Sequence, residues 1–164
     1  ENGRSTDDEI NLVLPGFNSG WREVIGLSNM TPEFNEENLE DFGGKGTYRD
    51  PEFIWRDTIA PTSVLFVHTD KLGSKYKDNL FVGSVKNGTI FNFPLDDTRT
   101  HLVLTGPLSD KKADTNNETG NVIFGRNFGV ITDLQIGPDG NLYILSNYKH
   151  DGTIFKITAK NNTN

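Results

Sequence analysis

The feature that most constrains the fold of this chain is an internal repeat. Residues 80–93 return in related form at residues 142–157, and both copies contain the tripeptide Thr-Ile-Phe. Each copy predicts a strand, a tight turn and a second strand, because Asn87–Gly88 and Asp151–Gly152 are residue pairs that adopt the positive φ angles of hairpin turns. A strand unit that recurs after about 60 residues is typical of a β-propeller blade.

Further strand patterns precede each copy of the repeat. Residues 63–68 precede the first copy, and residues 130–136, in which apolar and polar residues alternate, precede the second. Residues 137–140 then form a turn signal, and the 17 Gly and 7 Pro of the chain imply many short elements. The sequence therefore predicts an all-β fold, a β-propeller of four-stranded blades.

The chain is expected to form one partial propeller domain over residues 1–164, covering about two and a half blades. Its expected parts are the last strand of one blade with its connection (1–28), a polar, glycine-rich loop (29–52), a blade (53–108), an exposed loop (109–121), the last blade (122–160) and a tail (161–164). Because an open array leaves strand edges unpaired, we expect the remaining blades, in an N-terminal portion or in another chain, to cover them. A small β protein that covers its edges by oligomerising is the alternative.

Charge and composition narrow the classes of partner. A net charge of −7 disfavours nucleic acid, whose phosphate backbone repels an acidic surface. No apolar run approaches the roughly 20 residues that span a bilayer, so no membrane-spanning segment is expected. The chain has no cysteine, which excludes disulfides and thiolate metal sites. Sequons begin at Asn29, Asn87, Asn117 and Asn161 and agree with export.

Three stretches of the sequence resemble the glucose/sorbosone dehydrogenase family, whose members are soluble six-bladed quinoproteins. The first, residues 7–21, opens with Asp-Asp-Glu-Ile-Asn and ends with Gly-Trp; the second is the Thr-Ile-Ala-Pro of residues 58–61, followed by residues 82–88; the third, residues 132–143, contains Gly-Pro-Asp-Gly. Their order and spacing agree with the family over nearly the whole chain. The resemblance therefore implies that the chain supplies about two and a half of six blades.

This resemblance also implies an activity. Members of the family are aldose dehydrogenases that transfer a hydride from the sugar C1 to pyrroloquinoline quinone (PQQ), with a calcium ion polarising the quinone. The chain is thus expected to be part of a PQQ-dependent sugar dehydrogenase. The catalytic His of the family is expected in earlier blades, so this chain alone lacks it. The family habit also implies an extracellular, periplasmic or cell-surface location.

Site residues follow from the resemblance position by position. Asp8 matches a family Asp beside the reactive quinone, which makes it the catalytic candidate. The candidates for binding PQQ are Asn2, Thr58 and Lys86. Calcium favours oxygen ligands, including backbone carbonyls. The positions that hold the cofactor's calcium are Gly3 and Arg4, and those of a second, structural calcium are Glu9 and Ser19.

Two positions depart from the family pattern. Val130 and Thr132 stand where the family has arginines that clamp PQQ carboxylates, and neither side chain replaces a guanidinium. The alternative function is therefore a non-catalytic propeller that has lost PQQ binding and serves as a platform for carbohydrate or protein. Simpler interpretations also stay open for single residues: Lys86 as a solvated turn lysine, and Asp8 and Glu9 as charges that protect a strand edge.

Overall fold

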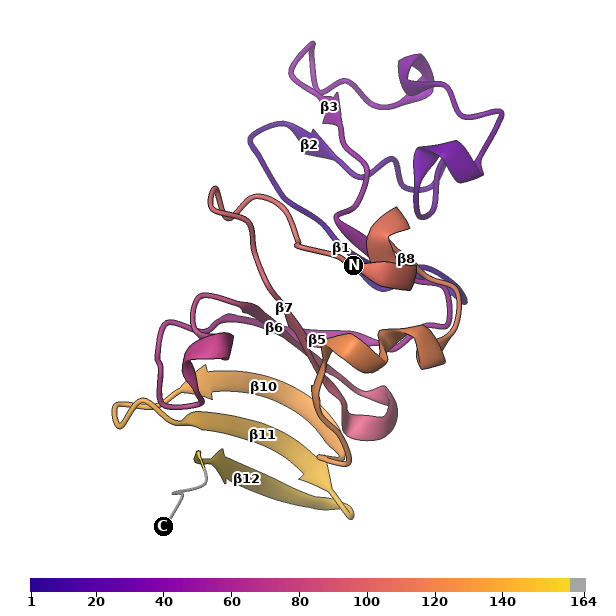
Figure 1. Cartoon of the computed structure of the whole chain (residues 1–164). Coiled ribbons are helices and arrows are strands. Elements are labelled where there is room, and N and C mark those ends of the chain that lie inside the picture. Colours follow the sequence, from indigo (N-terminus) through magenta and orange to yellow (C-terminus); the bar gives the residue numbers. More distant parts are fainter. Residues whose placement is uncertain (160–164) are drawn as a thin grey trace. The chain divides into compact units, whose positions relative to one another are not determined.

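The structure is a computed structural model, which describes residues 1–159. The expected tail (161–164), the last residue of the expected last blade and the sequon at Asn161 lie outside these residues. The chain divides into two compact units. Unit 1 comprises Glu1–Thr58 and Thr105–Glu118, and unit 2 comprises Ile59–Leu104 and the chain from Thr119 onward. The long strands lie in unit 2, whereas unit 1 has short strands connected by loops and 3₁₀ turns (Figure 1). Strands outnumber helices among the described elements, and every described helix is a short 3₁₀ turn, so the expectation of a mostly β fold is confirmed.

Unit 1 is organised around a small sheet with the strand order β1-β4-β8. The strands are β1 (Asp8–Ile10), β4 (Phe53–Trp55) and β8 (Lys112–Ala113). β1 pairs antiparallel with β4, and β8 pairs parallel with the other edge of β4. All three residues of β4 are buried, and the rings of Phe53 and Trp55 meet edge to face at 4.9 Å. This apolar run therefore forms the centre of the unit.

The expected loop 29–52 contains short regular elements. Its elements, with the strand that precedes them, are β2 (Phe17–Asn18), η1 (Ser28–Met30), η2 (Glu36–Asn38) and β3 (Thr47–Tyr48), where η denotes a 3₁₀ helix. β2 and β3 pair in parallel. The rings of Phe34 and Tyr48 pack at 4.8 Å, and the hydroxyl of Tyr48 donates to Asp50 Oδ1 at 2.7 Å. Side-chain contacts thus fix much of this polar segment.

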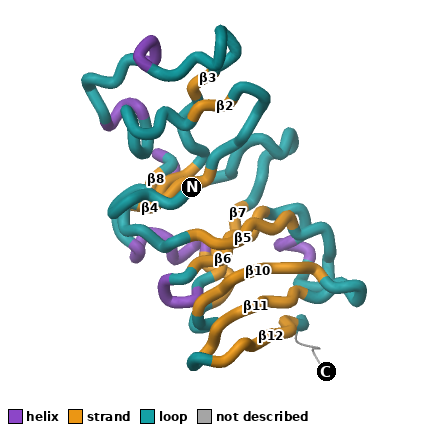
Figure 2. Tube along the Cα trace, turned by 180° about the vertical axis from the view of Figure 1, so that it is seen from behind, coloured by secondary structure: helices purple, strands orange, loops and turns teal. Residues whose placement is uncertain are grey.

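The other helices of the described chain are also short 3₁₀ turns. They are η3 (Ser74–Tyr76), η4 (Lys86–Gly88), η5 (Gly106–Asp110) and η6 (Asn116–Val122). Loops connect them over much of the trace, as Figure 2 shows. The expected loop 109–121 contains the end of η5, the strand β8 and most of η6.

Unit 2 contains two sheets. The first has the order β5-β6-β7-β9, formed by β5 (Pro61–Phe66), β6 (Leu80–Ser84), β7 (Ile90–Phe93) and β9 (Ile123–Gly125). The second has the order β10-β11-β12, formed by β10 (Val130–Ile136), β11 (Leu142–Tyr148) and β12 (Asp151–Ile157). Both views show β10, β11 and β12 side by side (Figures 1 and 2). β9 is joined to β7 in the first sheet, although it follows the residue at which we expected the last blade to begin.

The first strand of each sheet of unit 2, β5 or β10, carries a bulge. The register shifts between Pro61 and Ser63 in β5 and between Ile131 and Asp133 in β10, which leaves Thr62 and Thr132 as the extra residues. Because a bulge inserts one extra residue, side chains three positions apart can point to the same face of the sheet, where simple alternation would put them on opposite faces. In β10 it lets Ile131 and Leu134 both point into the core, where they are almost fully buried.

The core of unit 2 lies between its two sheets. Its buried members are Val67, Leu72, Phe81, Ile90, Ile131, Leu134, Leu142 and Ile144. Close approach of the sheets depends on Gly83, where an added Cβ would lie 2.8 Å from Ile131 Cγ2. Packing of this kind stabilises a domain by about 25 cal/mol for each Å² of apolar surface removed from water.

The structure corrects one of the two predicted turns. Asn87 and Gly88 adopt positive φ angles of 61° and 49°, as predicted. The prediction for Asp151 and Gly152 was wrong, because both lie in β12 and the residues with positive φ are the preceding Lys149 and His150. Cross-strand packing explains the difference, because the observed register sets apolar residues opposite each other. These pairs are Leu142 with Ile157, Ile144 with Phe155, and Leu145 with Ile154.

Candidate functional site

Two groups of residues in the chain have the chemistry of binding sites, one in each unit. The first group surrounds β1 in unit 1. Asp8 is 1% exposed, and its Oδ1 accepts a 2.8 Å hydrogen bond from the Gly3 amide. The structure thus brings two predicted site residues, Gly3 and Asp8, into direct contact. Asn2 and Arg4, on either side of Gly3, are exposed.

Glu9 is buried in the same strand and is held at both carboxylate oxygens. The Gly26 amide donates to Oε1 at 2.8 Å, and Asn11 Nδ2 donates to Oε2 at 3.0 Å. The charged N-terminus of Glu1 donates to the backbone carbonyl of Glu9 at 2.9 Å. Burial raises the pKa of the Glu9 carboxyl group above its usual value, while the bonds from Asn11 and Gly26 oppose that shift. Compensation of the buried charge is therefore incomplete.

Two further oxygen atoms beside Glu9 lack a partner. Asp7 Oδ1 and Asn11 Oδ1 are buried and accept no hydrogen bond from the described residues. Asp7 lies against Gly26, since a Cβ on Gly26 would be 3.7 Å from both Asp7 Cβ and Cγ. Buried oxygen atoms without donors are costly, and a hard cation such as calcium takes oxygen ligands of this type. Asp7, Glu9 and Asn11 therefore carry buried oxygen atoms of the type that calcium binds.

The arrangement is not a cluster of acidic ligands alone. Within residues 1–159, no three His, Asp or Glu side chains come together in a way that could hold a metal. A calcium ion at Glu9 would need the Asn11 amide oxygen and backbone carbonyls as well. Ser19, the other predicted residue of this calcium site, is half-buried in the turn in which the Gly20 amide donates to Asn18 Oδ1 at 2.8 Å. Thr58 is half-buried at the end of the first segment of unit 1.

In unit 2 the predicted residues lie around the ends of β6 and β10. Lys86 is exposed in η4, and its amide donates to the Ile59 carbonyl at 3.1 Å. Val130 opens β10 and is 40% exposed. Thr132 is the bulge residue, and its hydroxyl donates to the Leu145 carbonyl at 3.2 Å. The side chain of Thr132 therefore serves the sheet, and neither position presents a cation.

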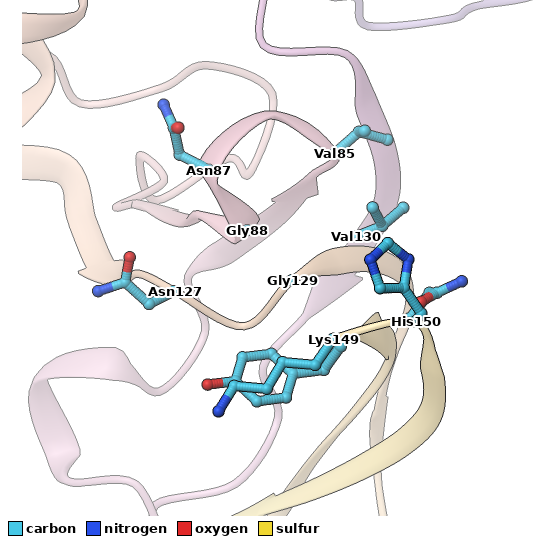
Figure 3. Close-up of a pocket in the computed structure, with 10 residues that line it drawn as sticks. Val85, Asn87, Gly88, Asn127, Gly129, Val130, Lys149 and His150 are labelled. Carbon is cyan, nitrogen blue, oxygen red and sulfur yellow. The ribbon is translucent and has the colours of Figure 1, made fainter.

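An open hollow of about 640 Å³ lies beside these residues in unit 2. Val85 and Asn87, the neighbours of Lys86 in sequence, line it together with Val130. In Figure 3 the side chains of Asn87 and Asn127 lie to one side of Gly88 and Gly129, and those of Val130 and His150 lie to the other. We call this feature the unit 2 hollow.

The floor of the unit 2 hollow is made of backbone segments in close contact. A Cβ on Gly88 would lie 2.3 Å from the Gly129 carbonyl oxygen, and a Cβ on Gly129 would lie 2.5 Å from the Asn147 carbonyl oxygen. The Asn127 amide donates to the Asn87 carbonyl at 3.2 Å, and the hydroxyl of Ser146 donates to the Phe128 carbonyl. Only glycine permits such approach, so the floor is rigid and fixes the polar groups above it.

The sequence reasoning missed several of these residues. Asp7 and Asn11 stand two positions before and after Glu9, so strand alternation could have placed them beside it. The second hairpin has two more residues than the first in its turn region, and this difference could have pointed to Lys149 and His150 as turn residues. No signal in the sequence pointed to Asn127, because its place in the hollow depends on the contact between Gly88 and Gly129.

Comparison with known proteins places the chain in a protein family. The profile of the family described as Glucose / Sorbosone dehydrogenase matches residues 1–156. The chain is 26% identical over 162 residues to the aldose sugar dehydrogenase YliI of Escherichia coli, and the match covers 98% of this chain and 38% of that relative. It is 23% identical over 160 residues to the uncharacterized protein slr1608 of Synechocystis, with 97% of this chain and 33% of that protein covered.

Solved structures resemble the fold at low sequence identity. A glucose dehydrogenase matches with a TM-score of 0.66 and 24% identity, covering 98% of this chain and 40% of that one. The soluble aldose sugar dehydrogenase of Escherichia coli in its apo form matches with a TM-score of 0.63 and 22% identity over 98% of this chain and 40% of that one. The PQQ-bound aldose sugar dehydrogenase of Streptomyces coelicolor matches with a TM-score of 0.59 and 18% identity over 96% of this chain and 38% of that one.

The chain spans between a third and two fifths of the length of these relatives and structures. Within residues 1–159, no helix is long and apolar enough to cross a bilayer.

Proposed function

Because the chain belongs to the glucose/sorbosone dehydrogenase family, we propose that it forms part of a PQQ-dependent oxidoreductase that oxidises an aldose at C1. The observation that carries this proposal is the set of buried oxygen atoms around Glu9, which lies within the stretch that resembles the family and fits the calcium ion that the family uses. The relatives named as aldose sugar dehydrogenases support the same assignment.

The proposed architecture is a six-bladed propeller to which this chain contributes about two and a half blades. The two sheets of unit 2, with four and three strands, support it, as does the share of the relatives that the chain covers. The expected division into a terminal strand, two blades and two loops belongs to the same proposal. The remaining blades are the proposed partner, and they would contribute the catalytic His.

Calcium is the first proposed ligand. Glu9 would bind a structural calcium ion, with Asp7 Oδ1 and Asn11 Oδ1 as further ligands and the Ser19 carbonyl as the fourth. The backbone carbonyls of Gly3 and Arg4 would hold the calcium of the cofactor. Because only the carbonyl of Arg4 is needed, its exposed guanidinium can point away from the ion into solvent.

PQQ is the second proposed ligand, and when bound it would supply the acceptor for the hydride from the sugar. Its three carboxylates require donors, which Asn2, Thr58 and Lys86 would provide. In unit 2 the exposed ammonium of Lys86 suits a carboxylate, and the adjacent unit 2 hollow has no acidic residue among its described lining. Asp8, already oriented by the Gly3 amide, would hold a negative charge next to the reacting centre.

A second function is favoured by one observation. Val130 and Thr132 present no cation, and the Thr132 hydroxyl is engaged with the sheet. A propeller without these clamps would serve as a non-catalytic platform for carbohydrate or protein. For either function we propose a location outside the cytoplasm, at the cell surface, in the periplasm or in the medium.

The deciding experiment is a titration of the intact protein with PQQ in the presence of calcium, followed by optical absorbance. Stoichiometric binding and bleaching of the quinone on addition of an aldose are expected of the enzyme. If the folded, intact protein binds no PQQ at tens of micromolar, which corresponds to a binding free energy of about −6 kcal/mol, the non-catalytic platform is the function that remains.

A further inference from the structure

The unit 2 hollow has one sign of charge. Lys149 and His150, on the turn between β11 and β12, contribute its charged and ionisable side chains, and no acidic residue belongs to the described lining. This contrasts with the chain as a whole, whose net charge is −7. A concave surface with local positive charge on an acidic protein favours an anionic ligand.

The hollow also contains neutral hydrogen-bond donors. The carboxamides of Asn87, Asn127 and Asn147 line the same hollow, and each carries an NH₂ group that can donate two hydrogen bonds. Asn87 and Asn127 have positive φ angles of 61° and 68°, and the 3.2 Å backbone hydrogen bond described above connects them. Because the floor beneath them is rigid, the protein loses little conformational entropy when a ligand binds.

The aromatic residue of the hollow decides between a neutral sugar and an anion. A sugar binds well where an aromatic face is open for stacking. The Tyr148 ring has the Lys149 ammonium 5.3 Å from its centroid, and the Phe155 ring packs edge to face against it at 5.4 Å. The ring therefore positions Lys149 by a cation–π contact, and the ammonium occupies ring surface that a sugar would stack on.

We propose that the unit 2 hollow binds the carboxylate group of a small ligand, with the Lys149 ammonium as the cation and with His150 and the three asparagine carboxamides as further hydrogen-bonding groups. The carboxylate has two possible sources, a carboxylate of PQQ or that of an acidic sugar such as a uronic acid. The inference rests on the lining of the hollow and not on the proposed dehydrogenase activity. With PQQ as the source, Lys149 supplies charge that Val130 and Thr132 do not.

The test is isothermal titration of the intact protein with three probes: PQQ, glucuronate and glucose. At least one carboxylate probe is expected to bind about tenfold or more tightly than glucose. The double variant Lys149→Gln/His150→Gln should weaken that binding by about tenfold or more. Lys75→Gln is the matched control, because the Lys75 ammonium also lies over a tyrosine ring, at 4.6 Å, but outside the lining of the hollow. Val130→Arg, at an exposed lining position, should tighten binding.

Equal binding of glucose and glucuronate, with no PQQ binding, would overturn the inference, as would an unchanged affinity in the double variant. If the double variant fails to fold, judged by its thermal unfolding, the Val130→Arg arm decides in its place. Binding of PQQ alone identifies the cofactor as the source of the carboxylate. Binding of glucuronate without PQQ keeps the inference and removes the proposed dehydrogenase function, so the two can fail separately.

Discussion

The backbone amide of Gly26 donates a 2.8 Å hydrogen bond to Glu9 Oε1. This bond joins the buried strand β1 to a loop that comes later in unit 1. Gly26 has a φ angle of 79°, and a Cβ at this position would lie 3.3 Å from Ile54 Cδ1, so the loop passes tightly over the sheet. The Glu9 carboxylate is therefore fixed between strand and loop, next to oxygen atoms that lack donors.

Removing the charge of Glu9 should weaken the stabilisation of the protein by calcium. A ligand that binds only the folded state at 100 times its Kd adds about 2.7 kcal/mol to the free energy of unfolding. We expect Glu9→Gln to lose most of this gain, because an amide is a weaker calcium ligand than a carboxylate. Thermal unfolding with and without calcium measures the difference. Glu33→Gln, at an exposed position of the same unit, should keep the full gain.

An alanine in the floor of the unit 2 hollow should destabilise the fold. Gly129 has a φ angle of 79°, and its added Cβ would approach the Asn147 carbonyl oxygen to 2.5 Å. Gly129→Ala is expected to lower the free energy of unfolding by about 2 kcal/mol or more. Gly152→Ala is the control, because nothing lies within 4 Å of its added Cβ, and its effect should stay within about 1 kcal/mol. Urea unfolding compares them, and equal losses would contradict the close contact.

The ion pair of Asp139 and Lys156 should make stability depend on acid pH. Lys156 Nζ lies 2.7 Å from Asp139 Oδ2, and this contact lowers the pKa of Asp139 below its ordinary value of 3.8. A lowered pKa stabilises the fold above 3.8, and the contribution is lost as the pH falls through the folded-state value. The stability advantage of the parent over Asp139→Asn should therefore be present at neutral pH and vanish in strong acid. Urea unfolding at both pH values tests this, and a difference that persists in acid would exclude the ion pair as its cause.

The outer face of the second sheet of unit 2 should promote self-association when this chain is produced by itself. Ile154 is 67% exposed and lies directly opposite Leu145, which is 36% exposed. Exposed apolar strand surface is a route to aggregation. Ile154→Lys should reduce association in sedimentation velocity, whereas Val103→Lys, at a 46% exposed site outside the strands, should not. Equal behaviour of both variants would show that the sheet face is not involved.

The sequence predicted the elements that depend on neighbouring residues. The alternation of residues 130–136 predicted β10, and the repeat predicted the paired strands β6–β7 and β11–β12. It misplaced the turn at Asp151 and Gly152, because the register is set by apolar contacts across strands and not by the turn residues.

The candidate site was less predictable than the fold. Glu9 came from a family resemblance, but the partnerless oxygens of Asp7 and Asn11 appear only when burial and hydrogen bonds are known. Thr132 could be recognised as a departure from the family pattern, yet its place at a bulge depends on pairing with β11. Lys149 could be assigned to the hollow only after the structure had shown that the turn lies at Lys149 and His150.

The parallel pairing of β4 with β8 sets an order of assembly for the nascent chain. Ile54 cannot meet Lys112 until the intervening strands β5, β6 and β7 have been synthesised, so the N-terminal unit closes its sheet late. Contacts between residues so distant in sequence slow folding, because the chain loses the entropy of closing a long loop before the stabilising contacts form. One edge of the fully apolar β4 therefore stays unpaired until β8 has been synthesised, and exposed apolar strand edges of this kind favour aggregation during folding.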